Sequence, residues 1–273
     1  VSMWFKLFAL RAKQYRQYYN NHRWNLYNRK NTQGLLKDDI TTWSNDEFIS
    51  AITFHYLASV RNKKALEQKK IETYDAIIIK GNTRKLRPTL FDLLAHEALD
   101  YFKSGDSYTT QPLNGFIINN ETSLRPMDDF IPIEWPTRDS SALPWLALDL
   151  FKQLLIFHRN DTDKNALVDI DLERIEWVYG QAAFSNKKII YQKTLETLVD
   201  QYPRVATTAN AWYLLARIAV DKAATYSAFG DTSNHYGYVK AKKIIENALA
   251  AFTEINPGTA NLRNLLNEIN TKE

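Results

Sequence analysis

The 273-residue sequence contains no cysteine and has only eight glycines and eight prolines. Without cysteine, the chain can form no disulfide, no thiolate metal site and no cysteine nucleophile. A β-rich domain needs a turn about every ten residues, so the scarcity of glycine and proline favours long helices. No apolar run approaches the length that spans a bilayer. Together with a mean hydropathy of −0.42, this excludes an integral membrane protein of the usual composition.

Strong charge of one sign is also lacking, because the formal net charge is only +4. Residues 1–100 hold 17 Lys or Arg against 10 Asp or Glu, whereas residues 101–273 hold 18 against 21. This basic excess is small for a nucleic-acid-binding protein. Residues 1–30 interleave aromatic and basic side chains, but their helical spacing favours a buried aromatic stripe with solvated cations over a surface for single-stranded nucleic acid. We therefore expect no nucleic-acid partner.

Helical periodicity is clearest between residues 191 and 269. Apolar residues recur at alternating spacings of three and four, which marks one face of a helix; they are Val205, Ala209, Trp212, Ala216, Ala219 and Ala223. The next helix repeats the pattern with Tyr238, Ala241, Ile245, Ala248 and Phe252. Small residues at helix contacts and an aromatic residue near each end predict an all-α fold, a tetratricopeptide-like array of helical hairpins that forms an α-solenoid, or superhelix.

Local signals place several helix ends. Ser44 followed by Glu47 three residues later predicts a helix start with a capping box. A further helix is expected after residues 61–64 and is predicted to end near Gly81, because glycine readily adopts the left-handed conformation. Pro88 is expected at or near the first position of the next helix, where its missing N–H costs nothing. Pro144 marks the first turn of a helix over residues 141–157.

The helical pattern is absent between residues 105 and 140, where six glycines and prolines interrupt the chain. The predicted organisation is an amino-terminal helical unit over residues 1–104, a long irregular loop or insertion over 105–140, and a carboxyl-terminal tetratricopeptide-like unit over 141–273. The alternative organisation is one continuous helical domain. A loop of this length is usually either functional or packed against the scaffold by its own side chains, and the sequence leaves both open.

Two patterns resemble metal sites but are incomplete. His96 and Glu97 begin a zinc-protease-like pattern, but Asp100 replaces the second histidine. Residues 161–165 resemble the start of a calcium loop, but Ala166 and Leu172 stand where glycine and glutamate are required. Helix capping by the aspartates and a structural histidine are the favoured interpretations. We expect no metal site, no cofactor and no catalytic residue, and the chain is predicted not to be an enzyme.

Two passages carry a family resemblance. One is NHRWNLYNR at residues 21–29, followed by DDITTW at 38–43; the other is LRPTLFDLLAHEALDYF at 86–102. Both resemble the amino-terminal helical region of the α-2-macroglobulin-like proteins of Bacteroidetes-type bacteria. The resemblance implies an exported envelope protein, periplasmic or at the cell surface, whose other domains trap or inhibit proteases. It also implies contact with the membrane only through an anchor outside this chain. The family's Cys-x-Glu-Gln thioester cannot be present here. The chain begins without a signal-peptide layout, so we expect a fragment of a longer protein.

The leading hypothesis is a non-enzymatic helical scaffold or interaction module of such a protein. Its partner would be a protease, an envelope component or the remaining domains of the same chain. The alternative is a glycan-binding helical envelope lipoprotein module, because seven Trp and fifteen Tyr offer surfaces on which sugars stack. The candidate binding residues are Trp24, Tyr27, Arg29, Trp135, Trp177, Tyr213 and Arg217. For the last three, packing between neighbouring hairpins is an equally good interpretation.

Overall fold

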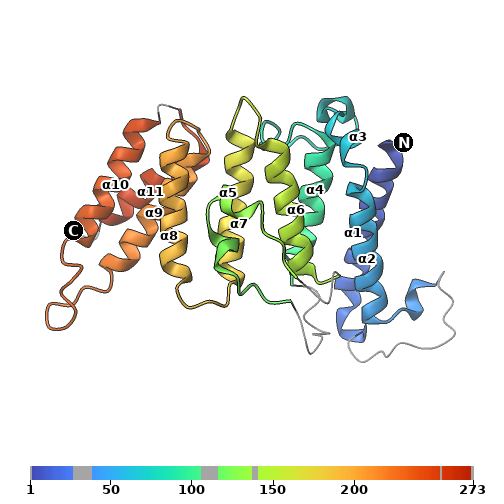
Figure 1. Ribbon diagram of the computed structural model, residues 1–273, viewed down its shortest axis with the longest axis horizontal. Coiled ribbons are helices and arrows are strands. Elements are labelled where there is room, and N and C mark those ends of the chain that lie inside the picture. The colour runs from blue at the N-terminus through green and yellow to red at the C-terminus, as the bar shows by residue number, and fades with distance from the viewer. Residues whose placement is uncertain (1, 27–38, 106–115, 137–140, 253, 272–273) are drawn as a thin grey trace. The chain divides into compact units, whose positions relative to one another are not determined.

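A computed structural model describes residues 2–26, 39–105, 116–136, 141–252 and 254–271 (Figure 1). Over these ranges the chain forms α-helices and short 3-10 helices, with no β-strand. The predicted all-α class is therefore confirmed. The α-helices are α1 (Ser2–Leu26), α2 (Asn45–Val60), α3 (Lys63–Glu67), α4 (Leu90–Phe102), α5 (Met127–Phe130), α6 (Leu143–His158), α7 (Asn165–Gln181), α8 (Lys187–Gln201), α9 (Thr208–Ala223), α10 (Gly237–Ala251) and α11 (Pro257–Asn270).

The chain divides into two compact units. Unit 1 comprises residues 1–117 and 135–154, and unit 2 comprises residues 118–134 and 155–273. The sequence-based division at residues 105–140 differs from this one in two respects. Residues 118–134 belong to unit 2, and the first three turns of α6 belong to unit 1.

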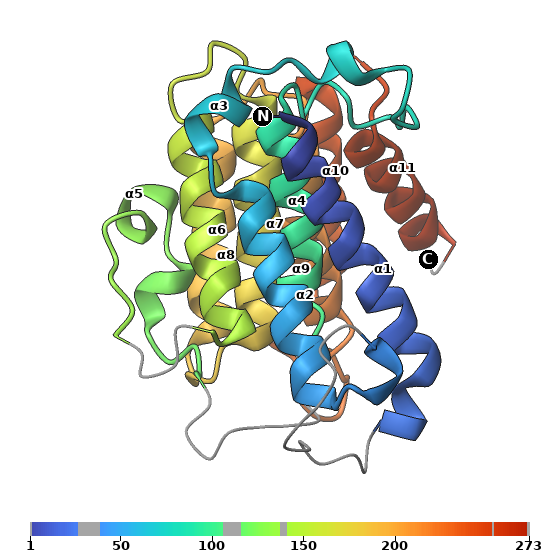
Figure 2. The same cartoon turned by 90° about the vertical axis from the view of Figure 1, so that its right-hand side faces the viewer.

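In unit 1, α1 and α2 lie side by side as an antiparallel pair, and α4 packs on α2 (Figure 2). The predicted aromatic stripe of α1 provides part of this contact, because Tyr19 is 1% exposed and Tyr18 stacks on Phe48 of α2 with ring centroids 5.5 Å apart. The predicted start of α2 is confirmed: the Ser44 hydroxyl accepts from the Glu47 amide, and the Glu47 carboxylate accepts from the Ser44 amide.

The prediction of a helix ending near Gly81 is wrong. α3 ends at Glu67, a 3-10 helix (η2, Ile71–Tyr74) follows, and residues 75–88 form turns. The chain leaves the helical path because Lys70 and Thr89 pair in an isolated antiparallel bridge. The Ile71 amide donates to the Pro88 carbonyl at 2.9 Å, and the Leu90 amide donates to the Lys69 carbonyl at 2.8 Å. These hydrogen bonds satisfy backbone groups that a longer helix would have used.

Pro88 lies near the start of α4, as predicted, two residues before its first residue Leu90. Thr89 is the N-cap, and it forms a capping box with Asp92 in which the Thr89 hydroxyl accepts from the Asp92 amide. The Asp92 carboxylate accepts in return from the Thr89 amide at 2.8 Å. Proline thus precedes the N-cap, and the threonine and aspartate side chains satisfy free N–H groups at the start of the helix.

The core of unit 2 includes a cluster from α9, α10 and α11, which pack on one another. Most of the predicted stripe residues are buried or partly buried, and the cluster itself contains Ala216, Val220, Ala241, Ile245, Ala248, Leu262, Leu265 and Ile269. Gly258, which follows Pro257 at the start of α11, shows how closely α11 approaches α9. A Cβ atom at Gly258 would lie 2.5 Å from the Ala209 carbonyl carbon, so only glycine fits without movement.

Residues 118–134 are packed into unit 2 by hydrogen bonds from α7 and α8. They contain a 3-10 helix (η4, Glu121–Leu124) and α5. Arg174 of α7 is fully buried, and its guanidinium donates to the carbonyl oxygens of Ser123 at 2.7 Å and Arg125 at 3.0 Å. Thr194 of α8 donates to the Leu124 carbonyl at 2.8 Å. This part of the predicted loop is therefore a packed element of the scaffold; residues 106–115 and 137–140 lie outside the described residues.

Candidate functional site

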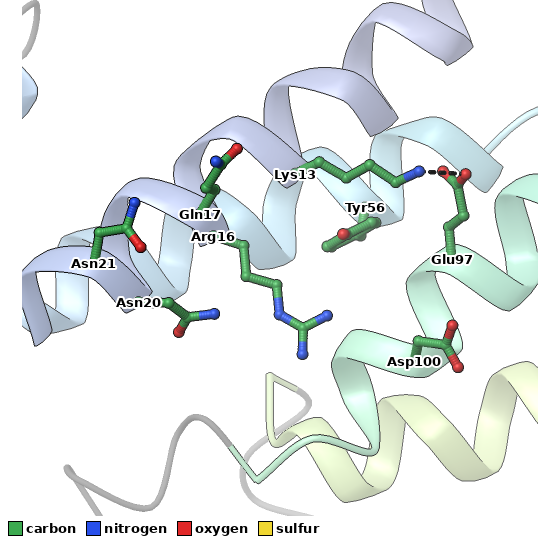
Figure 3. Close-up of a pocket in the computed structure, with 8 residues that line it drawn as sticks. All are labelled: Lys13, Arg16, Gln17, Asn20, Asn21, Tyr56, Glu97 and Asp100. Atoms are coloured by element: carbon green, nitrogen blue, oxygen red, sulfur yellow. Dashed lines mark hydrogen bonds and ion pairs between the residues drawn. The ribbon is translucent and has the colours of Figure 1, made fainter.

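A polar groove in unit 1 lies between α1 and α4, above Tyr56 of α2 (Figure 3). Its volume is about 480 Å³. The lining side chains are Lys13, Arg16, Gln17, Asn20 and Asn21 from α1, Tyr56 from α2, and Glu97 and Asp100 from α4. All but Tyr56 are charged or carry a side-chain amide, so the groove offers many hydrogen-bond donors and acceptors to a ligand.

The α1 wall of the groove follows from helical spacing. Ala12 and Tyr19 are buried against the rest of unit 1, so the opposite side of α1 carries residues free to be polar. Lys13, Gln17 and Asn20 lie on that side at spacings of four and three residues, and all three are exposed. Continuing the same row by four residues reaches Trp24, whose side chain is 89% exposed. The row therefore presents a cation, two amides and an indole along one line.

The α4 wall is held rigidly. The capping box at Thr89 and Asp92 begins the helix, and Leu94, Ala98 and Tyr101 are buried on its inner side. Glu97 projects toward Lys13 of α1, and Asp100, three residues later, also lines the groove (Figure 3). These two carboxylates thus form part of one wall of the groove. They belong to the sequence pattern at residues 96–100 that resembles an incomplete zinc site.

An ion pair and a cation–π contact hold the two cations that line the groove. The Lys13 ammonium bridges to the Glu97 carboxylate at 2.5 Å, which joins the two walls at one end. The Arg16 guanidinium lies 5.3 Å from the centre of the Tyr101 ring, close enough for a cation–π interaction. Burial raises the pKa of Tyr56, and the nearby Arg16 opposes that rise, so the phenol at the floor stays neutral at physiological pH.

A second pocket of about 530 Å³ lies in unit 1 and is mainly apolar. Its apolar wall consists of Phe5 and Phe8 from α1 and Phe54, Leu57, Ala58 and Val60 from α2, and Arg61, Lys63 and Gln153 complete the lining. His55 lies behind this wall, with its ring centroid 5.7 Å from Phe8 and 5.3 Å from Phe54. This pocket suits an apolar group, in contrast to the groove.

The two metal-like patterns have structural roles in the described residues. His96 is buried, and its Nδ1 lies 2.8 Å from the Asp92 carbonyl oxygen. His158 Nδ1 lies 2.7 Å from an Asp161 carboxylate oxygen, and Asp163 accepts from the Asn165 amide at the start of α7. Within the described ranges, no group of three or more His, Asp or Glu is arranged to hold a metal ion.

The predicted binding residues are distributed over both units. Trp24 and Trp135 belong to unit 1, whereas Trp177, Tyr213 and Arg217 belong to unit 2. Tyr27 and Arg29 lie outside the described residues.

Among the described candidates, Trp24 extends the row of side chains along the groove. Trp135 is partly buried, and its carbonyl accepts from the Trp145 indole at 3.2 Å. Tyr213 packs against the core cluster of unit 2, and Arg217 pairs with Glu268 at 3.5 Å and with Asp221 at 3.9 Å.

Sequence reasoning missed the amide residues of the groove, Gln17, Asn20 and Asn21. A signal for them was present, because they lie on α1 opposite the aromatic stripe and recur at helical spacing. The helical wheel marks that face as polar, but it does not reveal that α4 stands opposite and turns the face into a groove.

No protein-family model, no curated protein and no solved structure matches this chain. None of the described helices is both long enough and apolar enough to cross a membrane.

Proposed function

We propose that the chain is a non-enzymatic scaffold of tetratricopeptide-like helical hairpins that binds an extended polypeptide segment in the groove between α1 and α4. The observation that carries the proposal is the row of exposed side chains on α1. Within this polar face, Asn21 lies beside Asn20, and Lys13, Gln17 and Asn21 follow one another at intervals of four residues, about 6 Å along the helix axis. Backbone groups on one side of an extended chain recur every two residues, about 6.6–6.8 Å. The two repeats are close enough for successive amides to meet successive peptide groups.

Side-chain amides suit this task chemically. Each Gln or Asn both donates and accepts, so one amide can pair with the C=O and N–H groups of a main chain without regard to its sequence. The carboxylates of Glu97 and Asp100 and the cations of Lys13 and Arg16 would then select among polar side chains of the ligand. The exposed indole of Trp24 supplies an apolar anchor beyond the amides, of the kind that dominates binding energy at interfaces.

The sequence resemblance supplies the proposed context, an α-2-macroglobulin-like envelope protein involved in protease trapping. The passage at residues 86–102 coincides with α4 and the turn before it, and thus with the groove wall that carries Glu97 and Asp100. Under this proposal the protein is exported to the periplasm or the cell surface. The bound segment comes from a protease, an envelope component or another domain of the same protein.

Glycan binding is the alternative function. Planar polar side chains such as those of the groove also bind sugar hydroxyls, which is the observation in its favour. A sugar site normally adds an aromatic ring on which the sugar stacks, but Tyr56 at the floor is only 1% exposed. Neither of the two pockets described above has a tryptophan in its lining, so Trp24 at the end of the row would have to serve as the platform.

The test is selection of a random peptide display library on the wild-type chain, alongside a glycan array. The discriminating variant is Gln17→Ala with Asn21→Ala, and the matched control is Gln14→Ala with Asn25→Ala, which removes one glutamine and one asparagine from exposed positions of α1 outside the groove. Losing two hydrogen bonds of about 0.5–1.5 kcal/mol each should weaken the selected peptides about tenfold. The control should bind like the wild type. Peptides that bind both variants equally, or enrichment on glycans alone, would refute the proposal.

A further inference from the structure

Residues 61–88, which connect α2 to α4 in unit 1, form the most basic described stretch of that unit. They hold nine Lys or Arg against three Asp or Glu, a difference of +6, while the whole chain carries only +4. In Figure 2 this connection, which contains α3, lies at the end of unit 1 where α1 begins. We call it the basic connection.

Two isoleucines of the basic connection are exposed to an unusual degree. Ile79 is 97% exposed and Ile77 is 73% exposed, in a run of three consecutive isoleucines. Single exposed apolar residues are ordinary on protein surfaces. Here, however, two large aliphatic side chains stand two residues apart, directly before Lys80. Exposed aliphatic side chains among lysines combine the two features by which peripheral proteins hold to a lipid surface.

The connection is anchored to the rest of unit 1. Asp75 forms ion pairs with Lys80 at 2.7 Å and with Arg84, which fixes the turn that carries the isoleucines. The Lys6 ammonium of α1 lies 3.1 Å from the centre of the Tyr74 ring. At the same end of α1, Trp4 is 66% exposed. Tryptophan is enriched at membrane–water interfaces, where its ring meets both the apolar and the polar layer.

We propose that the basic connection is a peripheral binding surface for an anionic phospholipid bilayer. Ile77 and Ile79 enter the boundary between head groups and acyl chains, while the cations remain at the level of the phosphates. Lys69, Lys70 and Lys85 are among the exposed cations of the basic connection. A lipid surface is favoured over a protein partner because the isoleucines project almost fully into solvent. A protein partner would need a complementary pocket for each isoleucine, whereas both side chains can enter a fluid bilayer without a preformed pocket.

This inference is independent of the peptide groove, which uses other residues of α1 and α4. It departs from the sequence-based expectation that membrane contact comes only through an anchor outside this chain. An anchor and a basic surface act together well, because stable membrane attachment generally takes two signals.

The experiment is co-sedimentation of the chain with vesicles. One set contains phosphatidylglycerol and phosphatidylcholine in equal amounts, the other phosphatidylcholine alone, and each is measured in 50 mM and 500 mM salt. We expect binding to the anionic vesicles at low salt, with strong weakening at high salt because the attraction is screened. The pure phosphatidylcholine vesicles should bind much more weakly.

Two variants separate the charges from the isoleucines. Lys69→Gln, Lys70→Gln and Lys85→Gln together should weaken binding about a hundredfold, because each basic residue near an anionic surface contributes close to a factor of five. Ile77→Ser with Ile79→Ser should weaken it about tenfold or more without altering the fold, since both side chains are exposed. The matched controls in unit 2 are Lys188→Gln, Lys240→Gln and Lys243→Gln together, and Ile189→Ser with Ile255→Ser, all at exposed positions.

The proposal is overturned if the wild-type chain does not sediment with anionic vesicles at low salt. It is also overturned if the unit 2 variants lose as much binding as those in the basic connection. Binding that the isoleucine variant retains in full would mean a general attraction of cations to the surface, and would refute insertion.

Discussion

Replacing Arg174 with methionine is expected to lower the free energy of unfolding of unit 2 by about 3–5 kcal/mol. The guanidinium is fully buried and has three hydrogen-bonding partners: the Asp171 carboxylate at 2.8 Å and the carbonyl oxygens of Ser123 and Arg125. It also lies 4.4 Å from the centre of the Phe130 ring. Methionine retains an apolar stem of similar length but provides none of these hydrogen bonds.

The main contribution to that cost comes from Asp171. Its side chain is only 6% exposed, so after the substitution its carboxylate stays buried without a cation, and the two carbonyls lose their donor. Adding Asp171→Asn should therefore recover part of the loss, about 1–3 kcal/mol, because the unpaired buried charge is gone. The matched control is Arg159→Met. Arg159 is 52% exposed and holds the same segment through Asp128 at 2.8 Å, so its removal should cost at most about 1 kcal/mol.

Hydrogen–deuterium exchange measures this effect locally, which matters because a chain of two units need not unfold in one step. In the Arg174→Met variant, the amides of residues 118–134 should exchange much faster than in the wild type, with little change in α1 and α2. If residues 118–134 keep wild-type protection, or if Arg159→Met costs as much as Arg174→Met, then the buried guanidinium is not what holds this segment and the reasoning is refuted.

Two further predictions concern helix packing. His55 is buried, and its pKa lies below the usual value of about 6.5, because burial disfavours the charged ring and the positive charge of Arg11 repels the proton. The folded state therefore favours neutral His55: its stability contribution is complete above pH 6.5 and falls as the pH drops through the folded pKa. Denaturation of wild type and His55→Phe between pH 7 and 5 should show a smaller loss in the variant; equal slopes would contradict this. Ala216 is fully buried in the core cluster, so Ala216→Leu should cost about 1–3 kcal/mol by overpacking, whereas the exposed Ala250→Leu should cost little; an unchanged melting transition would contradict the packing.

The sequence determined the local features whose causes lie within one or two helical turns. The helical stripes of α9 and α10 predicted their buried faces, because periodicity alone decides which side of a helix is apolar. The capping box at Ser44 and Glu47 needed no partner from elsewhere in the chain. Pro88 marked the start of α4 to within two residues, and the hydrogen bonds of Thr89 and Asp92 fix where the helix begins. Local reasoning failed near Gly81, where pairing of Lys70 with Thr89 replaced a helix.

Only the tertiary structure decided the rest, because the groups concerned meet across long stretches of sequence. Glu97 and Lys13 are 84 residues apart in the sequence. Neither the sequence of α1 nor that of α4, taken alone, therefore indicates that a groove lies between them. Arg174 lies 51 residues beyond Ser123, and nothing local indicates that this arginine is buried rather than solvated. Periodicity tells which face of a helix is polar or apolar. Which residues lie opposite that face depends on packing between segments that are distant in the sequence. For that reason the groove and the packing of residues 118–134 could be recognised only in the folded structure.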